Sequence, residues 1–139
     1  MNESETRAEL IDPLLRSAGW GVVEDTKILR EYKITDGRIQ SGGVRSKPLI
    51  ADYVLVYKGR KLSVIEAKID ELEVSEGVAQ AKQYAKMLHI DFAYASNGKS
   101  IYAINMKTGK EGLLGAYSTP NELFAQTHGR ASLNSEFQQ

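Results

Sequence analysis

Two apolar stretches decide the fold of this chain: Leu49-Ile50-Ala51-Asp52-Tyr53-Val54-Leu55-Val56-Tyr57 and Leu62-Ser63-Val64-Ile65-Glu66-Ala67-Lys68. They are rich in β-branched and aromatic residues and are joined around Gly59, so they predict two neighbouring strands of a sheet. Each strand carries one acid, Asp52 in the first and Glu66 in the second. A carboxylate in such a strand is costly unless another group compensates its charge. The two acids therefore suggest a shared cation.

The register of this hairpin determines whether the two acids can meet. Side chains alternate across a strand, so Glu66 and Lys68 share one face, and a metal site also needs Asp52 on that face. A plain two-residue turn would pair Asp52 with Ile65 and place Glu66 on the opposite face. A loop one residue longer, or a bulge, pairs Asp52 with Glu66. We therefore predict a three-residue loop or a bulge around Lys58-Gly59-Arg60.

The rest of the sequence predicts helices on either side of these strands. Thr6 and Glu9 form a capping-box pattern that opens a helix, and Gly19 ends it. A strand or its approach is expected at Trp20–Val23, whereas residues 31–38 are ambiguous. Further predicted elements are an amphipathic helix over 74–88, short strands over 92–95 and 101–104 with a turn at 97–98, a strand over 112–117, and a short helix from 119. This order predicts an α/β domain with a mixed sheet and helices against its faces.

Composition narrows the class of protein. The 139 residues suit one compact domain, and the absence of cysteine excludes disulfides and thiolate metal sites and fits a reducing cytosol. Neither a signal-peptide core nor an apolar run of membrane-spanning length is present, so we expect a cytoplasmic protein with no membrane partner. The formal net charge is zero, which argues against tight, unaided nucleic-acid binding. If DNA is the substrate, we expect other domains or subunits to supply much of the affinity for it.

The acids suit a hard cation such as Mg²⁺, which takes one or two carboxylates and keeps several waters. We expect Asp52 and Glu66 to bind it together with the backbone carbonyl of Ala67, and Mn²⁺ to serve as a substitute. The metal would polarise a scissile phosphate and lower the pKa of a bound water, which Lys68 would orient or activate. The alternative is that Glu66 and Lys68 form an ordinary charged pair at the end of a surface strand.

The helix over 74–88 adds a second pair of residues. Gln80 and Tyr84 are four positions apart, so they share a helical face that borders the apolar stripe. Taken alone, the pair fits ordinary packing and solvent contacts equally well.

Together these residues resemble the PD-(D/E)xK nucleases, and within them the N-terminal endonuclease domain of the restriction subunit of type I restriction-modification enzymes. Ala51 stands where the motif name has Pro, but that Pro is not a ligand. The resemblance covers roughly residues 6–124, and it rests on five segments: Glu9–Trp20, Lys47–Tyr53, Val64–Lys68, the Gln-x-x-x-Tyr segment Gln80–Tyr84, and Ala95–Gly98.

The resemblance implies a restriction-endonuclease-like fold and specific roles for single residues. Asp52, Glu66 and Lys68 correspond to the catalytic core. Gln80 and Tyr84 correspond to supporting residues that position DNA or the metal site. Glu9 is a candidate accessory ligand, because related nucleases often place an acid on the first helix. Its alternative role is the Glu of the capping box.

The resemblance also implies partners. In that family the nuclease domain precedes a helicase-type motor that moves DNA on ATP, and it cuts double-stranded DNA together with specificity and methyltransferase subunits. We therefore expect residues 1–126 to form the nuclease domain and residues 127–139 to be a linker or truncated boundary toward a missing motor region. ATP would act only through that motor, and we expect the chain alone to be inactive.

Two other functions remain open from the sequence. One is a stand-alone repair or junction-resolving nuclease of the same fold. The other is a non-catalytic module that docks on DNA or on partner subunits, against which the intact set of two acids and a lysine argues.

Overall fold

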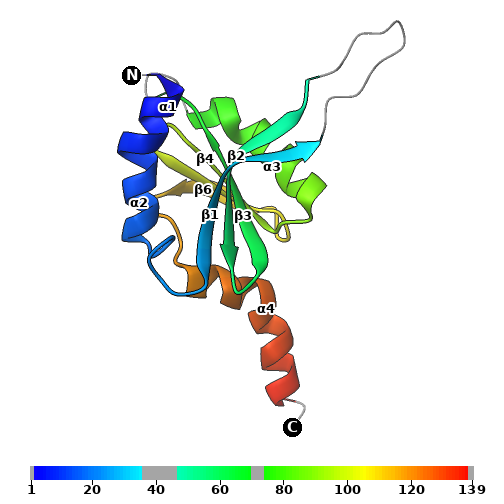
Figure 1. Cartoon of the computed structure of the whole chain (residues 1–139). Coiled ribbons are helices and arrows are strands. Elements are labelled where there is room, and N and C mark those ends of the chain that lie inside the picture. Colours follow the sequence, from blue (N-terminus) through cyan, green and yellow to red (C-terminus); the bar gives the residue numbers. More distant parts are fainter. Residues whose placement is uncertain (1, 36–46, 70–73, 138–139) are drawn as a thin grey trace, which may run out of the picture.

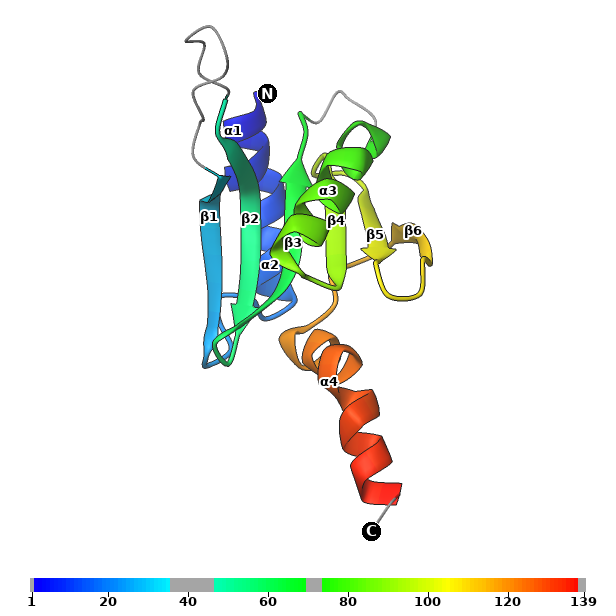
Figure 2. The same ribbon diagram turned by 90° about the vertical axis from the view of Figure 1, so that its right-hand side faces the viewer.

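The computed structural model describes residues 2–35, 47–69 and 74–137 (Figure 1). Its centre is a sheet of six strands: β1 (Thr26–Thr35), β2 (Leu49–Tyr57), β3 (Arg60–Ala67), β4 (Phe92–Ser96), β5 (Ile101–Asn105) and β6 (Glu111–Leu114). They lie side by side in sequence order (Figure 2). Only β3 and β4 run parallel among these neighbours, and the other pairs run antiparallel. The predicted α/β class with a mixed sheet is therefore confirmed.

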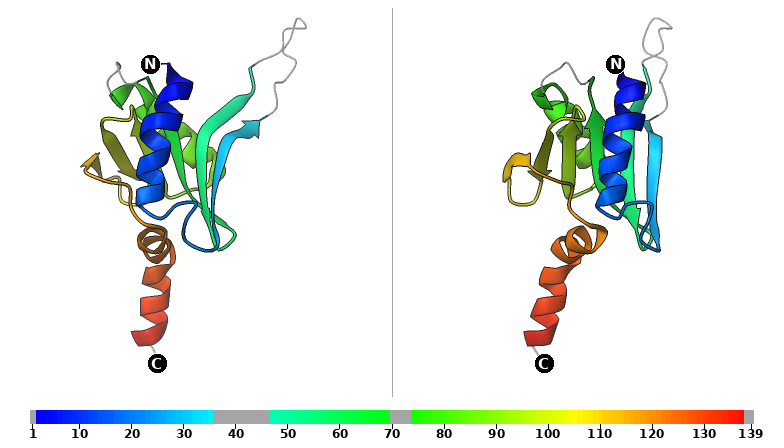
Figure 3. Two further views of the ribbon diagram at one scale, coloured as in Figure 1. Left: turned by 60° about the vertical axis from the view of Figure 1, so that its left-hand side comes forward. Right: turned by 90° about the vertical axis from the view of Figure 1, so that its left-hand side faces the viewer.

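Helices cover both faces of the sheet (Figures 2 and 3). One face carries a continuous helical segment made of α1 (Glu3–Thr6), the π-helix η1 (Arg7–Ile11) and α2 (Asp12–Ser17). The other face carries the 3₁₀ turn η2 (Val74–Gly77) and α3 (Val78–Leu88). The last helix, α4 (Pro120–Phe137), begins below the sheet and projects away from it. No helix in the described part of the chain is both long and apolar enough to cross a membrane.

Two apolar layers hold these elements together, one on each face of the sheet. Under the N-terminal helices, Ile11, Leu15 and Trp20 pack with strand residues such as Ile65. Under α3, the small residues Ala81 and Ala85 allow the helix to pack against the opposite face of the same strands. Because both faces are covered, β2, β3 and β4 read as nearly continuous apolar runs in the sequence.

The first helix begins earlier than predicted, with a different cap. Asn2 is its N-cap, and its side chain accepts a hydrogen bond from the backbone amide of Glu5 at 2.8 Å. Thr6 lies inside the helix and donates its hydroxyl to the carbonyl of Asn2 at 2.9 Å. The predicted capping box of Thr6 and Glu9 is therefore wrong, because the helix has already begun. Gly19 follows its end with a φ of +104°, as a terminating glycine requires.

Of the two alternatives expected at Trp20–Val23, a strand or its approach, the strand is wrong and the approach is confirmed. These residues form turns, and the first strand, β1, begins at Thr26. Trp20 is fully buried, and its indole Nε1 donates a hydrogen bond to the carbonyl of Ser118 at 2.9 Å. Trp20 in this aromatic and β-branched run therefore fixes the turn to the core by tertiary contacts instead of forming part of a strand.

The elements after the hairpin agree with prediction apart from small shifts in their ends. η2 and α3 together cover the predicted amphipathic helix. Between β4 and β5, the side chain of Asn97 accepts hydrogen bonds from the amides of Lys99 and Ser100, which forms the predicted turn.

The final helix is much longer than the short one predicted. It starts with a capping box, in which the Thr119 amide donates to Glu122 Oε1 at 2.8 Å and the Glu122 amide donates to Thr119 Oγ1 at 3.1 Å. The helix continues to Phe137, through most of the segment expected to be a linker. The linker role of residues 127–139 stays a prediction.

Candidate functional site

The β2–β3 hairpin contains the predicted bulge. Its turn has two residues, Lys58 and Gly59, both with positive φ, as the tight hairpin turns require. Val56 pairs with Lys61, but the preceding Leu55 pairs with Ser63, so the intervening Leu62 is extra on β3. The bulge thus lies within β3 rather than in the turn. Beyond it the pairs continue to Tyr53 and Ile65, a register that places Asp52 opposite Glu66.

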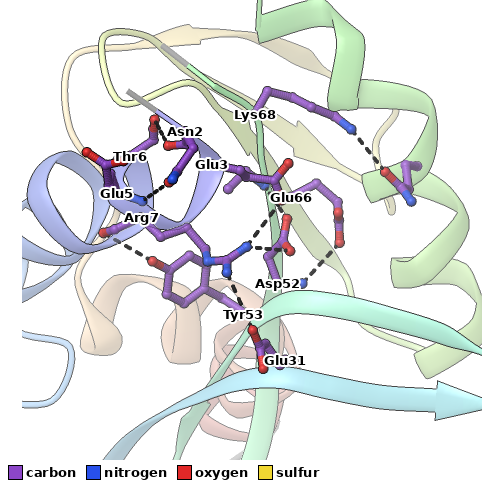
Figure 4. Close-up of polar contacts among 12 residues, drawn as sticks. Asn2, Glu3, Glu5, Thr6, Arg7, Glu31, Asp52, Tyr53, Glu66 and Lys68 are labelled. Atoms are coloured by element: carbon purple, nitrogen blue, oxygen red, sulfur yellow. Dashed lines mark hydrogen bonds and ion pairs between the residues drawn. The ribbon is translucent and has the colours of Figure 1, made fainter.

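Asp52 and Glu66 contact each other where β2 separates from β3. The backbone amide of Asp52 donates to Glu66 Oε1 at 3.3 Å, and the amide of Ala67 donates to Asp52 Oδ2 at 2.7 Å (Figure 4). The side-chain alternation of β2 breaks here, because Ala51 and Val54 both pack in the layer under α3. Opposite this point in β1, Glu31 has a φ of +51°. The backbone irregularity holds Asp52 at the seam between the strands.

The surroundings of Glu66 disfavour the ionised form of its carboxyl group. Its side chain is only 3% exposed, and burial, followed by the negative charge of Asp52, raises its pKa well above the usual range. The hydrogen bond from the Asp52 amide and the charge of Lys68 act in the opposite direction without reversing the shift. Two adjacent carboxylates of which one resists ionisation are an arrangement that a divalent cation would stabilise.

Lys68 is held by the helix on the α3 face. Its Nζ lies 3.5 Å from Gln80 Oε1, and Gln80 Nε2 donates to the hydroxyl of Tyr84 at 2.8 Å. The backbone amide of Lys68 donates to the carbonyl of Ser96 at 2.8 Å, so its strand position is fixed by β4. The structure therefore brings the predicted supporting pair, Gln80 and Tyr84, into one chain of contacts with Lys68.

Arg7 is a residue of this site that the sequence motifs do not predict. Its Nη1 lies 3.2 Å from Asp52 Oδ1 and 3.1 Å from Glu3 Oε1, and its Nη2 lies 3.5 Å from Glu31 Oε1 (Figure 4). One signal was present in the sequence: Arg7 precedes the buried Ile11 by four residues, so a charge stands on the core-facing stripe of the helix.

The acid of the first helix that lies near Asp52 is Glu3. Burial, then the charge of Asp52, raises the pKa of Glu3. Glu9 is exposed on the same helix. Its accessory role stays a prediction.

The donor set fits a hard cation. Asp52 and Glu66 offer carboxylate oxygens, and the predicted carbonyl of Ala67 would add a third oxygen at the end of β3. No group of three or more His, Cys, Asp or Glu side chains converges on a metal position within the described residues. That arrangement still suits Mg²⁺, which takes one or two carboxylates and fills its octahedron with water.

Comparison with known proteins identifies the family. Residues 2–120 match the model of the type I restriction enzyme R protein N terminus (HSDR_N). The chain belongs to this family. The R-protein N-terminal domain described here is 35% identical over 102 residues to the type I restriction enzyme EcoAI endonuclease subunit of Escherichia coli, across 70% of this chain and 12% of that subunit. The chain thus spans a small part of its curated relative.

A solved structure agrees with this assignment. It is a fragment described as an HsdR subunit of a type I restriction enzyme from Vibrio vulnificus YJ016, and it superposes with a TM-score of 0.86 at 37% identity. The match covers 93% of this R-protein N-terminal domain and 26% of the other chain. The mixed six-stranded α/β architecture described above therefore matches that of an HsdR fragment.

Proposed function

We propose that this domain is the Mg²⁺-dependent endonuclease module of a type I restriction enzyme and that it hydrolyses phosphodiester bonds of double-stranded DNA. The observation that carries the proposal is the meeting of Asp52 and the buried Glu66 at the seam of β2 and β3, with Lys68 two residues further along. Keeping the charge of a buried carboxylate beside a second acid is costly, since burial penalises the ionised form. Arg7 offsets part of the charge of Asp52, and a bound cation would compensate both carboxylates.

Each side chain has a role in this proposal. Asp52 and Glu66 would hold Mg²⁺, with Mn²⁺ as a substitute. When bound, the metal supplies Lewis-acid activation of the phosphate and a more acidic water. Lys68 presents an ammonium group that orients the attacking water or offsets phosphoryl charge. Gln80 fixes the position of that ammonium group through its amide oxygen, and Tyr84 fixes Gln80 in turn.

The proposed partners follow from the family. As part of an R subunit, the domain would act with motor domains of the same full-length chain, which use ATP, and with specificity and methyltransferase subunits in the cytoplasm. Zero net charge supports the view that these partners provide most of the DNA affinity.

The decisive experiment is cleavage by the full-length, assembled enzyme carrying Asp52→Ala. We expect at least about a 100-fold loss of double-strand cleavage, because a metal ligand is lost, while DNA-dependent ATP hydrolysis is retained. Asp91→Ala is the matched control: Asp91 pairs with Lys107 at 3.5 Å, away from the site, so cleavage should be unchanged. Wild-type cleavage by a folded Asp52→Ala enzyme would reject the nuclease role and favour the docking module.

A further inference from the structure

Arg7 takes part in more ionic contacts than any other described residue of this region. Three carboxylates surround its guanidinium, from Glu3 on the same helix, Glu31 on β1 and Asp52 on β2. The Arg7 side chain is only 20% exposed, and that of Asp52 14%, whereas that of Glu31 is 71% exposed. Its pairing with Asp52 is therefore the well-shielded one, where an ion pair is least screened by solvent.

The π-helix anchors Arg7 at this place. Arg7 begins η1, and its carbonyl accepts the amide of Asp12, which follows after five residues instead of four. The same carbonyl oxygen lies 3.3 Å from the hydroxyl of Tyr53, next to Asp52 in β2. Both the backbone and the side chain of Arg7 thus face the segment of β2 that carries the candidate ligand. Single π turns are frequent at functional sites.

We propose that Arg7 is a positioning residue that pairs with Asp52 Oδ1 while no metal is bound and yields that oxygen to the divalent cation, so that Arg7 sets the affinity of the site for metal. This inference rests on the proposed nuclease function.

Both partners keep other contacts when the pair opens. Asp52 remains fixed through Oδ2, which accepts the amide of Ala67 at 2.7 Å. Arg7 remains paired with Glu3 and Glu31. The exchange therefore leaves neither charge without a partner, which makes release of Oδ1 inexpensive.

The sign of the effect separates this role from a merely structural one. A guanidinium beside a metal ligand repels the arriving cation and occupies a lone pair that the cation needs. Removing the guanidinium should therefore tighten metal binding. If Arg7 only maintained the shape of the site, removing it would weaken metal binding.

The test measures Mn²⁺ affinity of this chain by the loss of the free-ion electron paramagnetic resonance signal. We expect Arg7→Gln to tighten binding about five- to tenfold, and Arg7→Lys to change it less because a cation remains. Arg30→Gln is the matched control. Arg30 pairs with Asp12 at 3.0 Å and lines the same surface pocket as Arg7, so the variant removes an equal charge nearby without touching Asp52. Its affinity should stay within about twofold of wild type.

The outcomes distinguish the two proposals. If wild type binds no Mn²⁺ at millimolar concentration, or binds it equally well with Asp52→Asn, both the proposed function and the role of Arg7 fail. If binding depends on Asp52 but Arg7→Gln binds equally or more weakly, only the role of Arg7 fails. Should Arg7→Gln not fold, Arg7→Met decides, since it also removes the positive charge and an affinity equal to or below that of wild type overturns the proposal.

Discussion

The carboxylate of Asp52 accepts a hydrogen bond from the backbone amide of Ala67 at 2.7 Å, across the point where β2 and β3 separate. The last paired residues of the two strands are Tyr53 and Ile65. Beyond this pair, the Ala67 amide of β3 donates to the side chain of Asp52 instead of to a backbone carbonyl of β2. Asp52 therefore serves the fold as well as the site, and its two contributions can be separated by substitution.

Asp52→Asn should separate them. The amide oxygen can still accept the Ala67 amide, so we expect the free energy of unfolding to stay within about 1 kcal/mol of wild type, whereas Asp52→Ala leaves that buried amide unpaired and should cost about 1–3 kcal/mol. Both variants should lose cleavage, since neither carries the charge. Urea denaturation of this chain measures the stability difference. Equal stability losses in the two variants would contradict the structural role of the hydrogen bond.

Glu66→Gln should stabilise the metal-free chain at neutral and alkaline pH. The pKa of Glu66 is raised in the folded chain above its ordinary value of 4.5, so between the two values the folded state binds more protons than the unfolded state. Stability therefore falls as pH rises through that window and is restored below it. A neutral amide removes this cost, and we expect a gain of about 1–2 kcal/mol at pH 8 and little change at pH 4.

Glu111→Gln provides a control of opposite sign. The side chain of Glu111 pairs with Lys82 at 2.7 Å, and this contact, followed by that of Tyr102, lowers its pKa. Its replacement by Gln should slightly reduce stability at neutral pH rather than raise it. Thermal unfolding at both pH values reads out the two variants. If the Glu66→Gln chain is no more stable than wild type at pH 8, ionised Glu66 does not destabilise the folded chain as inferred.

Gln80→Ala should slow the chemical step with little effect on DNA binding. Lys68 loses the amide oxygen 3.5 Å from its Nζ, so its ammonium group is no longer held in place. In the assembled enzyme we expect kcat for cleavage to fall about tenfold with KM within about twofold, since misplacement of a reacting group mainly affects the transition state. Single-turnover cleavage at saturating enzyme measures this.

Gln83→Ala is the matched control, because Gln83 is exposed on the same helix. Gln80→Glu should partly restore activity, since its carboxylate still accepts from Lys68. A fall in DNA affinity without a change in kcat would place Gln80 at the DNA instead of at Lys68.

Much of this fold can be predicted because its signals are local. The apolar runs of β2 and β3, the periodicity of α3 and the capping box of Thr119 and Glu122 are all visible within a few residues of sequence. Even the need for a bulge follows from counting, since the acids must face each other. The position of the bulge at Leu62 depends on how β3 packs in the folded chain, and the local sequence does not indicate that packing.

The features that escaped prediction depend on long-range contacts. Trp20 has the composition of a strand residue but is buried by the distant Ser118 segment. The contact between Arg7 and Asp52 joins residues far apart in sequence, through a π turn that no propensity indicates. The N-cap is a local exception: Asn2 caps the first helix, although the pattern of Thr6 and Glu9 favours a later start.

Because of the bulge at Leu62, two acids separated by an even number of residues can face each other across this hairpin. In a hairpin closed by a two-residue turn, facing residues are separated by an odd number of positions. Asp52 and Glu66 are separated by 14, an even number, and the extra residue in β3 absorbs the difference. A relative with an odd spacing can reach the same arrangement with two regular strands. Among aligned relatives, a single-residue gap in this hairpin is therefore compatible with an intact site, and it marks where the sheet is kinked rather than where function was lost.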